Sequence, residues 1–125
     1  MILDTHALSA FADEVPSAVK EVSSAGRIAI PVVVVGEYRY GIAHSLRGHD
    51  YEKWLRPFLE TCQVLEITAL TIPWYVGVRS ELRRLGKPIP ANDVWIAALC
   101  RQHDLPLLSR DAHFDRVKGL RRVNW

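Results

Sequence analysis

Four acidic residues that lie far apart in the sequence have the chemistry of a divalent metal site. Asp4 ends the apolar opening MILD, and Asp111 follows the apolar run LPLLS. Asp93 falls at the start of the helical pattern PANDVWIAAL, and Glu37 lies in VVVVGEYRYGI. Carboxylates held together raise one another's pKa, so the group would stay ionised near neutral pH only beside a cation. Mg²⁺ or Mn²⁺ would suit it, because both accept oxygen ligands and keep bound waters.

A metal held in this way would serve phosphate chemistry, since it lowers the pKa of a bound water and offsets charge on a phosphoryl oxygen. Asp115 lies one helical turn beyond Asp111, so the fourth ligand is either residue or is shared between them. Taken alone, Asp115 is a surface acid. His6 and His113 are expected to pack or to contact substrate rather than to bind a hard cation, and a surface position fits His113 equally well.

Each acid also has a simpler explanation. Asp93, with Asn92 beside it, suits a helix cap or a favourable charge at a helix N-terminus. Glu37 can be an exposed residue or an ion-pair partner of Arg39 or of a distant arginine. Asp4 is harder to explain in this way, because burying an acid at the end of a core strand is costly without a partner. The metal hypothesis therefore requires the four side chains to converge.

Short apolar runs alternate with helical patterns along the chain. We expect strands at residues 2–5, 27–30, 63–67, 105–109 and 120–125, and helices at 6–13, 16–25, 31–46, 50–62, 71–86 and 90–104. The valine run is assigned to a helix because Val34, Tyr38 and Ile42 follow helical spacing, and Pro57 should bend or break the fourth helix. This alternation predicts a three-layer α/β/α fold with a parallel central sheet. Asp4 and Asp111 would then lie at the carboxyl ends of strands, where such sheets bind ligands.

The composition is typical of a soluble globular protein. The chain has 125 residues with 49% hydrophobic and 24% charged residues, which predicts a single domain over residues 1–125. Cys62 and Cys100 lack zinc-like spacing, and two isolated thiols favour a reducing, cytoplasmic location. No signal peptide or membrane span is expected, because the longest apolar run is IAIPVVVVG. Basic residues concentrate after Arg79, which suits either a polyanionic partner or a solvated helix face.

Together, the four acidic segments resemble the motifs of PIN-domain ribonucleases, and most closely those of the VapC toxins of type II toxin–antitoxin modules. The segments are ILDTHAL, VVVVGEYRYGI, GKPIPANDVWIAALC and LPLLSRDAHFDRV, and the resemblance extends over essentially the whole chain. It implies a PIN-like fold, Mg²⁺- or Mn²⁺-dependent hydrolysis of RNA, a cognate VapB-type antitoxin and a homodimer. Carried over by position, it implies metal-binding roles for Asp4, Glu37, Asp93 and Asp111, and hydroxyl groups lining the site from Thr5 and Ser109.

The leading hypothesis is therefore a metal-dependent endoribonuclease in which Asp4 and Asp93 are the main metal anchors. Arg110 or Arg39 would hold the RNA backbone, because a guanidinium can bind a phosphate through two hydrogen bonds. An antitoxin would cover apolar helix surface, for which the sequence offers Phe11, Tyr40, Ile42 and Leu46.

Two alternatives remain open. One is a Mg²⁺-dependent phosphohydrolase with Asp4 as nucleophile, although His6 stands where such enzymes commonly carry a second Asp. The other is a non-catalytic module that binds nucleic acid or protein and merely carries acids at its sheet edge. In that case the change Asp4→Asn would leave metal affinity and activity unaltered.

Overall fold

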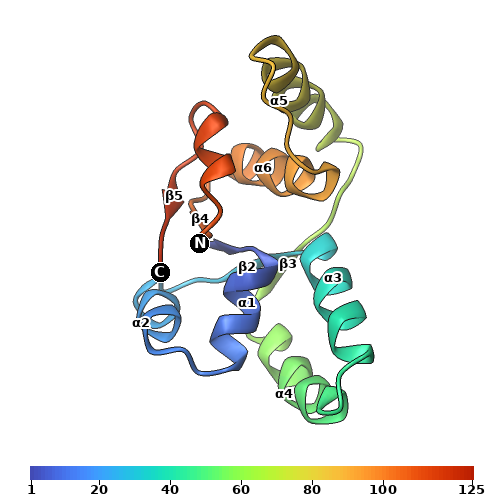
Figure 1. Cartoon of the computed structure of the whole chain (residues 1–125), viewed down its shortest axis with the longest axis vertical. Coiled ribbons are helices and arrows are strands. Elements are labelled where there is room, and N and C mark those ends of the chain that lie inside the picture. The colour runs from blue at the N-terminus through green and yellow to red at the C-terminus, as the bar shows by residue number, and fades with distance from the viewer.

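A parallel five-stranded sheet forms the centre of the molecule, as the computed structural model of residues 1–125 shows (Figure 1). The strands are β1 (Ile2–Leu3), β2 (Ala29–Pro31), β3 (Gln63–Leu65), β4 (Leu107–Leu108) and β5 (Arg122–Val123), in the spatial order β3-β2-β1-β4-β5. Every neighbouring pair is parallel. All carboxyl ends therefore lie at one edge of the sheet. The five predicted strands are all present, and each is shorter than expected.

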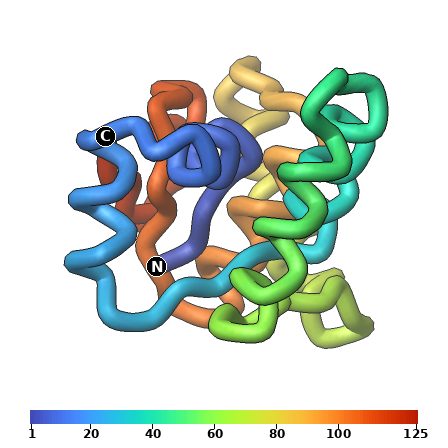
Figure 2. The backbone as a smooth tube through the Cα atoms, turned by 90° about the horizontal axis from the view of Figure 1, so that it is seen from below, coloured from blue at the N-terminus to red at the C-terminus, as the bar shows by residue number.

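Six α-helices cover the two faces of this sheet. They are α1 (Thr5–Ala12), α2 (Pro16–Ser24), α3 (Val32–Ala43), α4 (Gly48–Glu60), α5 (Ile72–Arg84) and α6 (Ala91–His103). In Figure 1, α5 and α6 lie above the strands, whereas α1, α2 and α4 lie below them. Figure 2, seen from below, shows α1 between α2 and the α3–α4 pair. The predicted three-layer α/β/α architecture is thus confirmed.

Local sequence explains where several helices begin and end. Pro16 occupies the first turn of α2, where its missing N–H costs nothing. Gly86 follows α5 with φ of 64°, a left-handed conformation that glycine adopts without strain. Of the two outcomes predicted at Pro57, a bend or a break, the break does not occur, because α4 continues through this residue to Glu60. Pro57 is exposed and lies in the last turn of α4, so the helix loses little hydrogen bonding there.

The core brings together the central strands and α6. Ile2 and Leu3 of β1 and Leu107 and Leu108 of β4 are fully buried. The middle of α6 is buried as well, at Val94 and from Ile96 to Cys100, whereas Ile89 and Trp95 are only partly buried. Buried strands and a buried helix make the edge of the sheet a rigid support for side chains that follow them.

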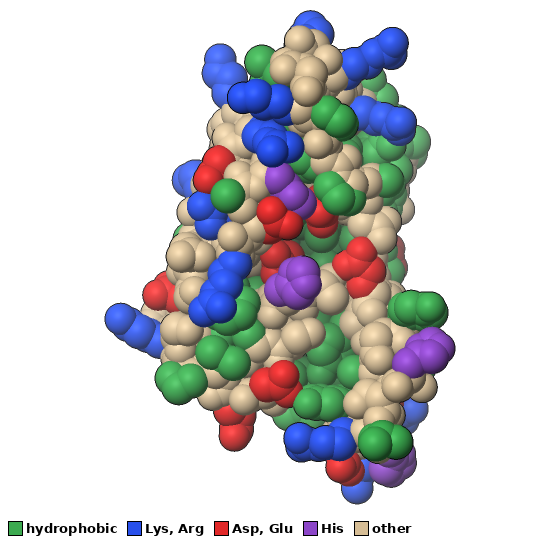
Figure 3. Space-filling view, in the orientation of Figure 1, with side chains coloured by type: hydrophobic (Ala, Val, Ile, Leu, Met, Phe, Trp, Pro, Cys, Tyr) green, Lys and Arg blue, Asp and Glu red, His purple; other side chains and the backbone are tan.

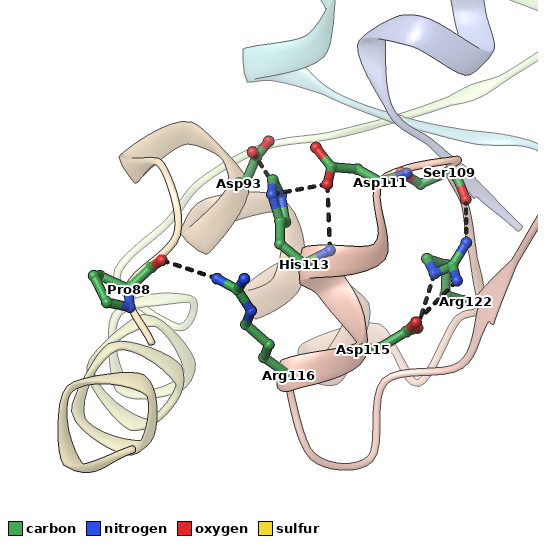
Figure 4. A network of polar contacts seen from close by, with 8 residues as sticks. All are labelled: Pro88, Asp93, Ser109, Asp111, His113, Asp115, Arg116 and Arg122. Carbon is green, nitrogen blue, oxygen red and sulfur yellow. Dashed lines mark hydrogen bonds and ion pairs between the residues drawn. The ribbon is translucent and has the colours of Figure 1, made fainter. Parts of the chain in front are cut away.

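A short 3₁₀ helix, η1 (Ala112–Arg116), was not predicted from the sequence. It follows β4 and is anchored by Phe114, which is 1% exposed. An Arg116 guanidinium N–H also donates to the Pro88 carbonyl at 3.4 Å, which ties η1 to the α5–α6 connection (Figure 4). Both cysteines are free thiols, in agreement with the sequence analysis. None of the helices combines the length and the apolar character needed to cross a membrane.

Candidate metal centre

Asp4 and Asp111 follow adjacent parallel strands and cap the helical turns after them. The Asp4 carboxylate accepts a 2.7 Å hydrogen bond from the Ala7 N–H at the start of α1, and only 5% of Asp4 is exposed. Asp111 caps η1 by accepting from the His113 N–H at 3.3 Å. Because β1 and β4 are neighbours in register, both carboxylates reach the same edge of the sheet. Figure 3 shows acidic side chains gathered near two histidines in the middle of this face, with Lys and Arg side chains concentrated at the α5 end above them.

His113 lies between two of the predicted metal-binding acids. Its Nε2 atom is 3.0 Å from Asp93 Oδ2, and its Nδ1 atom is 2.9 Å from Asp111 Oδ1 (Figure 4). Its side chain is 16% exposed, so the surface position considered for His113 is wrong. Despite the short distance to Asp93, the buried Nε2 forms no hydrogen bond of good geometry. This nitrogen is therefore a polar atom that the protein alone leaves unsatisfied.

Burial and the charges of neighbouring acids raise the pKa of Asp93. For Asp93 the main cause is burial, and the charges of Glu37, Asp111 and Asp4 raise its pKa further while His113 lowers it. These charge effects indicate that Asp93 lies within electrostatic range of the other three acids.

Burial is also the main reason that the pKa of Asp4 is raised. Hydrogen bonds from the Ser109 hydroxyl and the Ala7 N–H act in the opposite direction, and the charge of Asp111 adds to the increase. Ser109 is fully buried, and its hydroxyl oxygen also accepts the Asp111 N–H at 3.0 Å. Ser109 thus connects the first acid of the cluster to the fourth.

None of the four acids is paired with an arginine or lysine. The arginine ion pairs involve Glu52, Glu81, Asp104 and Asp115 instead. Asp4 is buried and the other three acids are partly buried, so without such a partner they are costly to keep ionised, and a divalent cation would offset that cost.

Glu37 reaches the cluster from α3 and is held by two neutral donors. The Thr5 hydroxyl donates to its Oε2 atom, and the Asn92 amide donates to its Oε1 atom at 2.6 Å. The alternative pairing with Arg39 is wrong, since Arg39 binds Glu52 of α4 at 2.9 Å. Asp93 is not the cap of α6 either, because Pro90 occupies that position, but it does lie in the first turn of this helix, where a negative charge is favourable.

Asp115 points away from the cluster. Both of its oxygens accept hydrogen bonds from Arg122, at 2.8 and 2.9 Å (Figure 4). The structure therefore brings Asp111, rather than Asp115, to the other acids. Arg110 also turns elsewhere: its guanidinium carbon lies 3.8 Å from the centre of the Trp125 ring, and its Nε–H donates to the Trp125 carbonyl at 2.8 Å.

The donor set is compatible with a divalent metal. Asp93, Asp111 and His113 each offer a ligand atom, and these atoms lie within 4.8 Å of one another. The unsatisfied Nε2 of His113 provides a further indication, because a metal can accept its lone pair. Carboxylates suit Mg²⁺ and Mn²⁺, and imidazole binds Mn²⁺ more readily than Mg²⁺.

Comparison with known proteins agrees with this architecture. The family model of the PIN domain matches residues 1–120. Ribonuclease VapC2 of Haemophilus influenzae is 30% identical over 103 residues, which cover 82% of this chain and 78% of that relative. The tRNA(fMet)-specific endonuclease VapC of Shigella flexneri is 29% identical over 101 residues, covering 80% and 76%.

A solved structure is similar over nearly its full length. The crystal structure of VapBC2 from Rickettsia felis, bound to a DNA fragment from their promoter, superposes with a TM-score of 0.89 at 25% identity, covering 99% of this chain and 97% of that one. The chain therefore belongs to the PIN-domain family. Within that family its relatives are the VapC ribonucleases of toxin–antitoxin systems, which confirms the predicted family and class of enzyme.

Proposed function

We propose that this protein is a VapC-type toxin that cleaves RNA with a divalent metal held by Asp4, Glu37, Asp93 and Asp111. The observation that supports the proposal is the grouping of Asp93 and Asp111 with His113, while Glu37 is bound to the neighbours of Asp4 and Asp93 and none of the four acids has an arginine or lysine partner. In a purely structural cluster, we expect lysine or arginine side chains to neutralise these charges. In a metal site, the bound cation neutralises them instead.

The protein's own residues would orient the site. Asp93 and Asp111 offer the closest ligand atoms, together with His113, and the Asp4 carboxylate is fixed by the Ala7 N–H. Mg²⁺ or Mn²⁺ bound there would supply a water of lowered pKa and would offset charge on the scissile phosphate. Ser109 and Thr5 contribute hydroxyls that hold the acids in place.

The substrate of this reaction is proposed to be RNA. One relative is named a tRNA(fMet)-specific endonuclease, so tRNA is the first RNA to test. Arg110 and Arg39 remain candidates for binding the RNA backbone. Each is bound to another group in the structure, Arg110 to Trp125 and Arg39 to Glu52, so it would first have to leave that partner.

We further propose a VapB-type antitoxin as partner, because similar solved structures are VapBC complexes. Of the four apolar residues considered for its binding, Tyr40 and Leu46 are strongly exposed, at 73% and 107%. Phe11 instead packs against Trp54 and Phe58, and Ile42 is partly buried. A homodimer, a cytoplasmic location and a single PIN domain over residues 1–125 complete the proposal.

The experiment is cleavage of tRNA by the purified protein with Mg²⁺ or Mn²⁺ and with excess EDTA. The wild type should cleave only with metal. The variant Asp93→Asn should lose about three orders of magnitude in rate, because metal-ion catalysis supplies several kcal/mol. Asp115→Asn is the matched control and should retain activity. Cleavage that survives EDTA, or an Asp93→Asn protein as active as wild type, would refute the proposal and favour another role for these acids.

The same preparations also test the two alternatives. A phosphohydrolase with Asp4 as nucleophile would form an acid-labile aspartyl-phosphate that can be trapped. A non-catalytic binding module would bind RNA equally well with Asp4→Asn and would show no metal-dependent cleavage.

A further inference from the structure

Glu37 is the one acid of the cluster whose two carboxylate oxygens are both held by side chains of other elements. Thr5 of α1 donates to Oε2, and Asn92 of α6 donates to Oε1 at 2.6 Å. Glu37 itself belongs to α3. Three helices are thus joined at a single side chain.

Both donors to Glu37 lie next to another acid of the cluster in the sequence. Thr5 directly follows Asp4, and Asn92 directly precedes Asp93. Each hydrogen bond to Glu37 therefore ties it to a segment that carries another acid of the cluster. A carboxylate held at both oxygens cannot rotate about its last bond without breaking a contact, so its orientation toward the neighbouring acids is fixed.

We propose that Asn92 is a positioning residue of this site: its amide sets the orientation of the Glu37 carboxylate for binding of the divalent metal. The inference rests on the proposed function, because it assigns Asn92 a role in that same metal site. Asn92 acts through Glu37 and is not itself a ligand.

The choice of an amide at residue 92 follows from the charges around it. A lysine or arginine would also donate to Glu37, but its charge would neutralise the acids and compete with a divalent ion. An aspartate would add another negative charge and provide no donor when ionised. Asparagine donates a hydrogen bond and adds no charge, which leaves the negative potential of the cluster intact.

The start of α6 does not explain this asparagine. Pro90 occupies the N-cap position of α6, and no side chain caps the helix. Asn92 is also exposed, so it contributes little to the core. The Asn92 side chain makes one hydrogen bond, and that bond is to Glu37.

Calorimetric titration with Mn²⁺ tests this role in four proteins: wild type, Asn92→Ala, Glu37→Gln and the double variant. Residues that orient metal ligands typically contribute 10–100-fold in metal affinity, so Asn92→Ala should weaken Mn²⁺ binding by roughly 10-fold or more. If Asn92 acts through Glu37, the same change should have less than about a twofold effect in the Glu37→Gln background. Asn124→Ala removes the other asparagine of the chain, which is exposed at the C-terminal end, and should bind Mn²⁺ as wild type does.

Two further measurements separate positioning from a general structural effect. The thermal unfolding midpoint of metal-free Asn92→Ala should stay within about 2 °C of wild type, because surface changes usually alter stability little. In the metal-free protein, the carboxyl ¹³C resonance of Glu37 should shift in Asn92→Ala and stay unchanged in Asn124→Ala. The variant Asn92→Asp, which has nearly the same shape but no donor, should impair cleavage at least as strongly as Asn92→Ala.

The outcomes distinguish this inference from the proposed function. If the wild type neither binds Mn²⁺ nor cleaves RNA, the proposed function fails and the inference fails with it. If the wild type does both and Asn92→Ala binds Mn²⁺ equally well, only the role of Asn92 is refuted. Equal losses of affinity in the wild-type and Glu37→Gln backgrounds would also overturn it, because Asn92 would then act independently of Glu37.

Discussion

The imidazole Nε2 of His113 lies 3.0 Å from a carboxylate oxygen of Asp93, and no lysine or arginine approaches that carboxylate as closely. His113 lowers the pKa of Asp93, yet burial outweighs it and the pKa is raised. A histidine therefore satisfies this acid only in part. The remaining cost of keeping the carboxylate ionised is what a divalent cation would offset.

The pH dependence of stability should reveal this cost in the metal-free protein. The pKa values of Asp4 and Asp93 are raised in the folded state, so the folded protein holds protons that the unfolded chain releases from about pH 3.9 upward. The contribution of Asp4 and Asp93 to the free energy of unfolding is thus greatest at low pH. It is lost as the pH rises through their pKa values in the folded protein. Urea unfolding in EDTA at pH 4 to 7 should show a smaller loss for Asp93→Asn than for wild type. Identical pH dependence in the two proteins would contradict the raised pKa of Asp93.

Divalent metal should stabilise the fold at pH 7, and Asp111 should be required for the effect. A ligand present at 100 times its dissociation constant adds about 2.7 kcal/mol to the free energy of unfolding. The unfolding midpoint should therefore rise with Mn²⁺ in wild type but not in Asp111→Asn. Asp115→Asn provides the control, since both Asp115 oxygens are bound by Arg122 and should not contribute. If Asp115→Asn loses the Mn²⁺ effect instead, the fourth acid of the site is Asp115, and its assignment to Asp111 is wrong.

Asp4 should have separable roles in the fold and in the site. Its carboxylate caps α1 through the Ala7 N–H, and an asparagine at residue 4 still offers an oxygen to that N–H. We expect Asp4→Asn to keep near-wild-type stability, whereas Asp4→Ala should lose about 1 kcal/mol for the missing cap. Both variants should lose RNA cleavage. An active Asp4→Asn enzyme would remove Asp4 from the metal site.

The sequence predicts the strands that deliver Asp4 and Asp111, because an apolar run ending in an acid is visible without coordinates. It does not reveal that the four acids meet, since their convergence depends on the pairing and register of strands far apart in the chain. The sequence does not place His113 in the cluster for a related reason. Its position is set by η1, a five-residue 3₁₀ helix anchored by Phe114, and so short an element has no clear periodicity.

Other features of the site could have been inferred from the sequence. Residues two apart on a helix point in different directions, which already argues against a pair between Glu37 and Arg39. In the structure Arg39 reaches across to Glu52 on α4. Likewise, Pro90 marks the start of α6, so helix capping does not explain the asparagine at residue 92.

The central claim is that the four acids form one binding site for a divalent cation, and Mn²⁺ titration of the metal-free protein at pH 7 tests it most directly. We expect saturable binding in wild type and in Asp115→Asn, and no saturation in Asp93→Asn at the concentrations that saturate wild type. A wild-type protein that binds no Mn²⁺, or an Asp93→Asn protein that binds it as tightly as wild type, would contradict the claim.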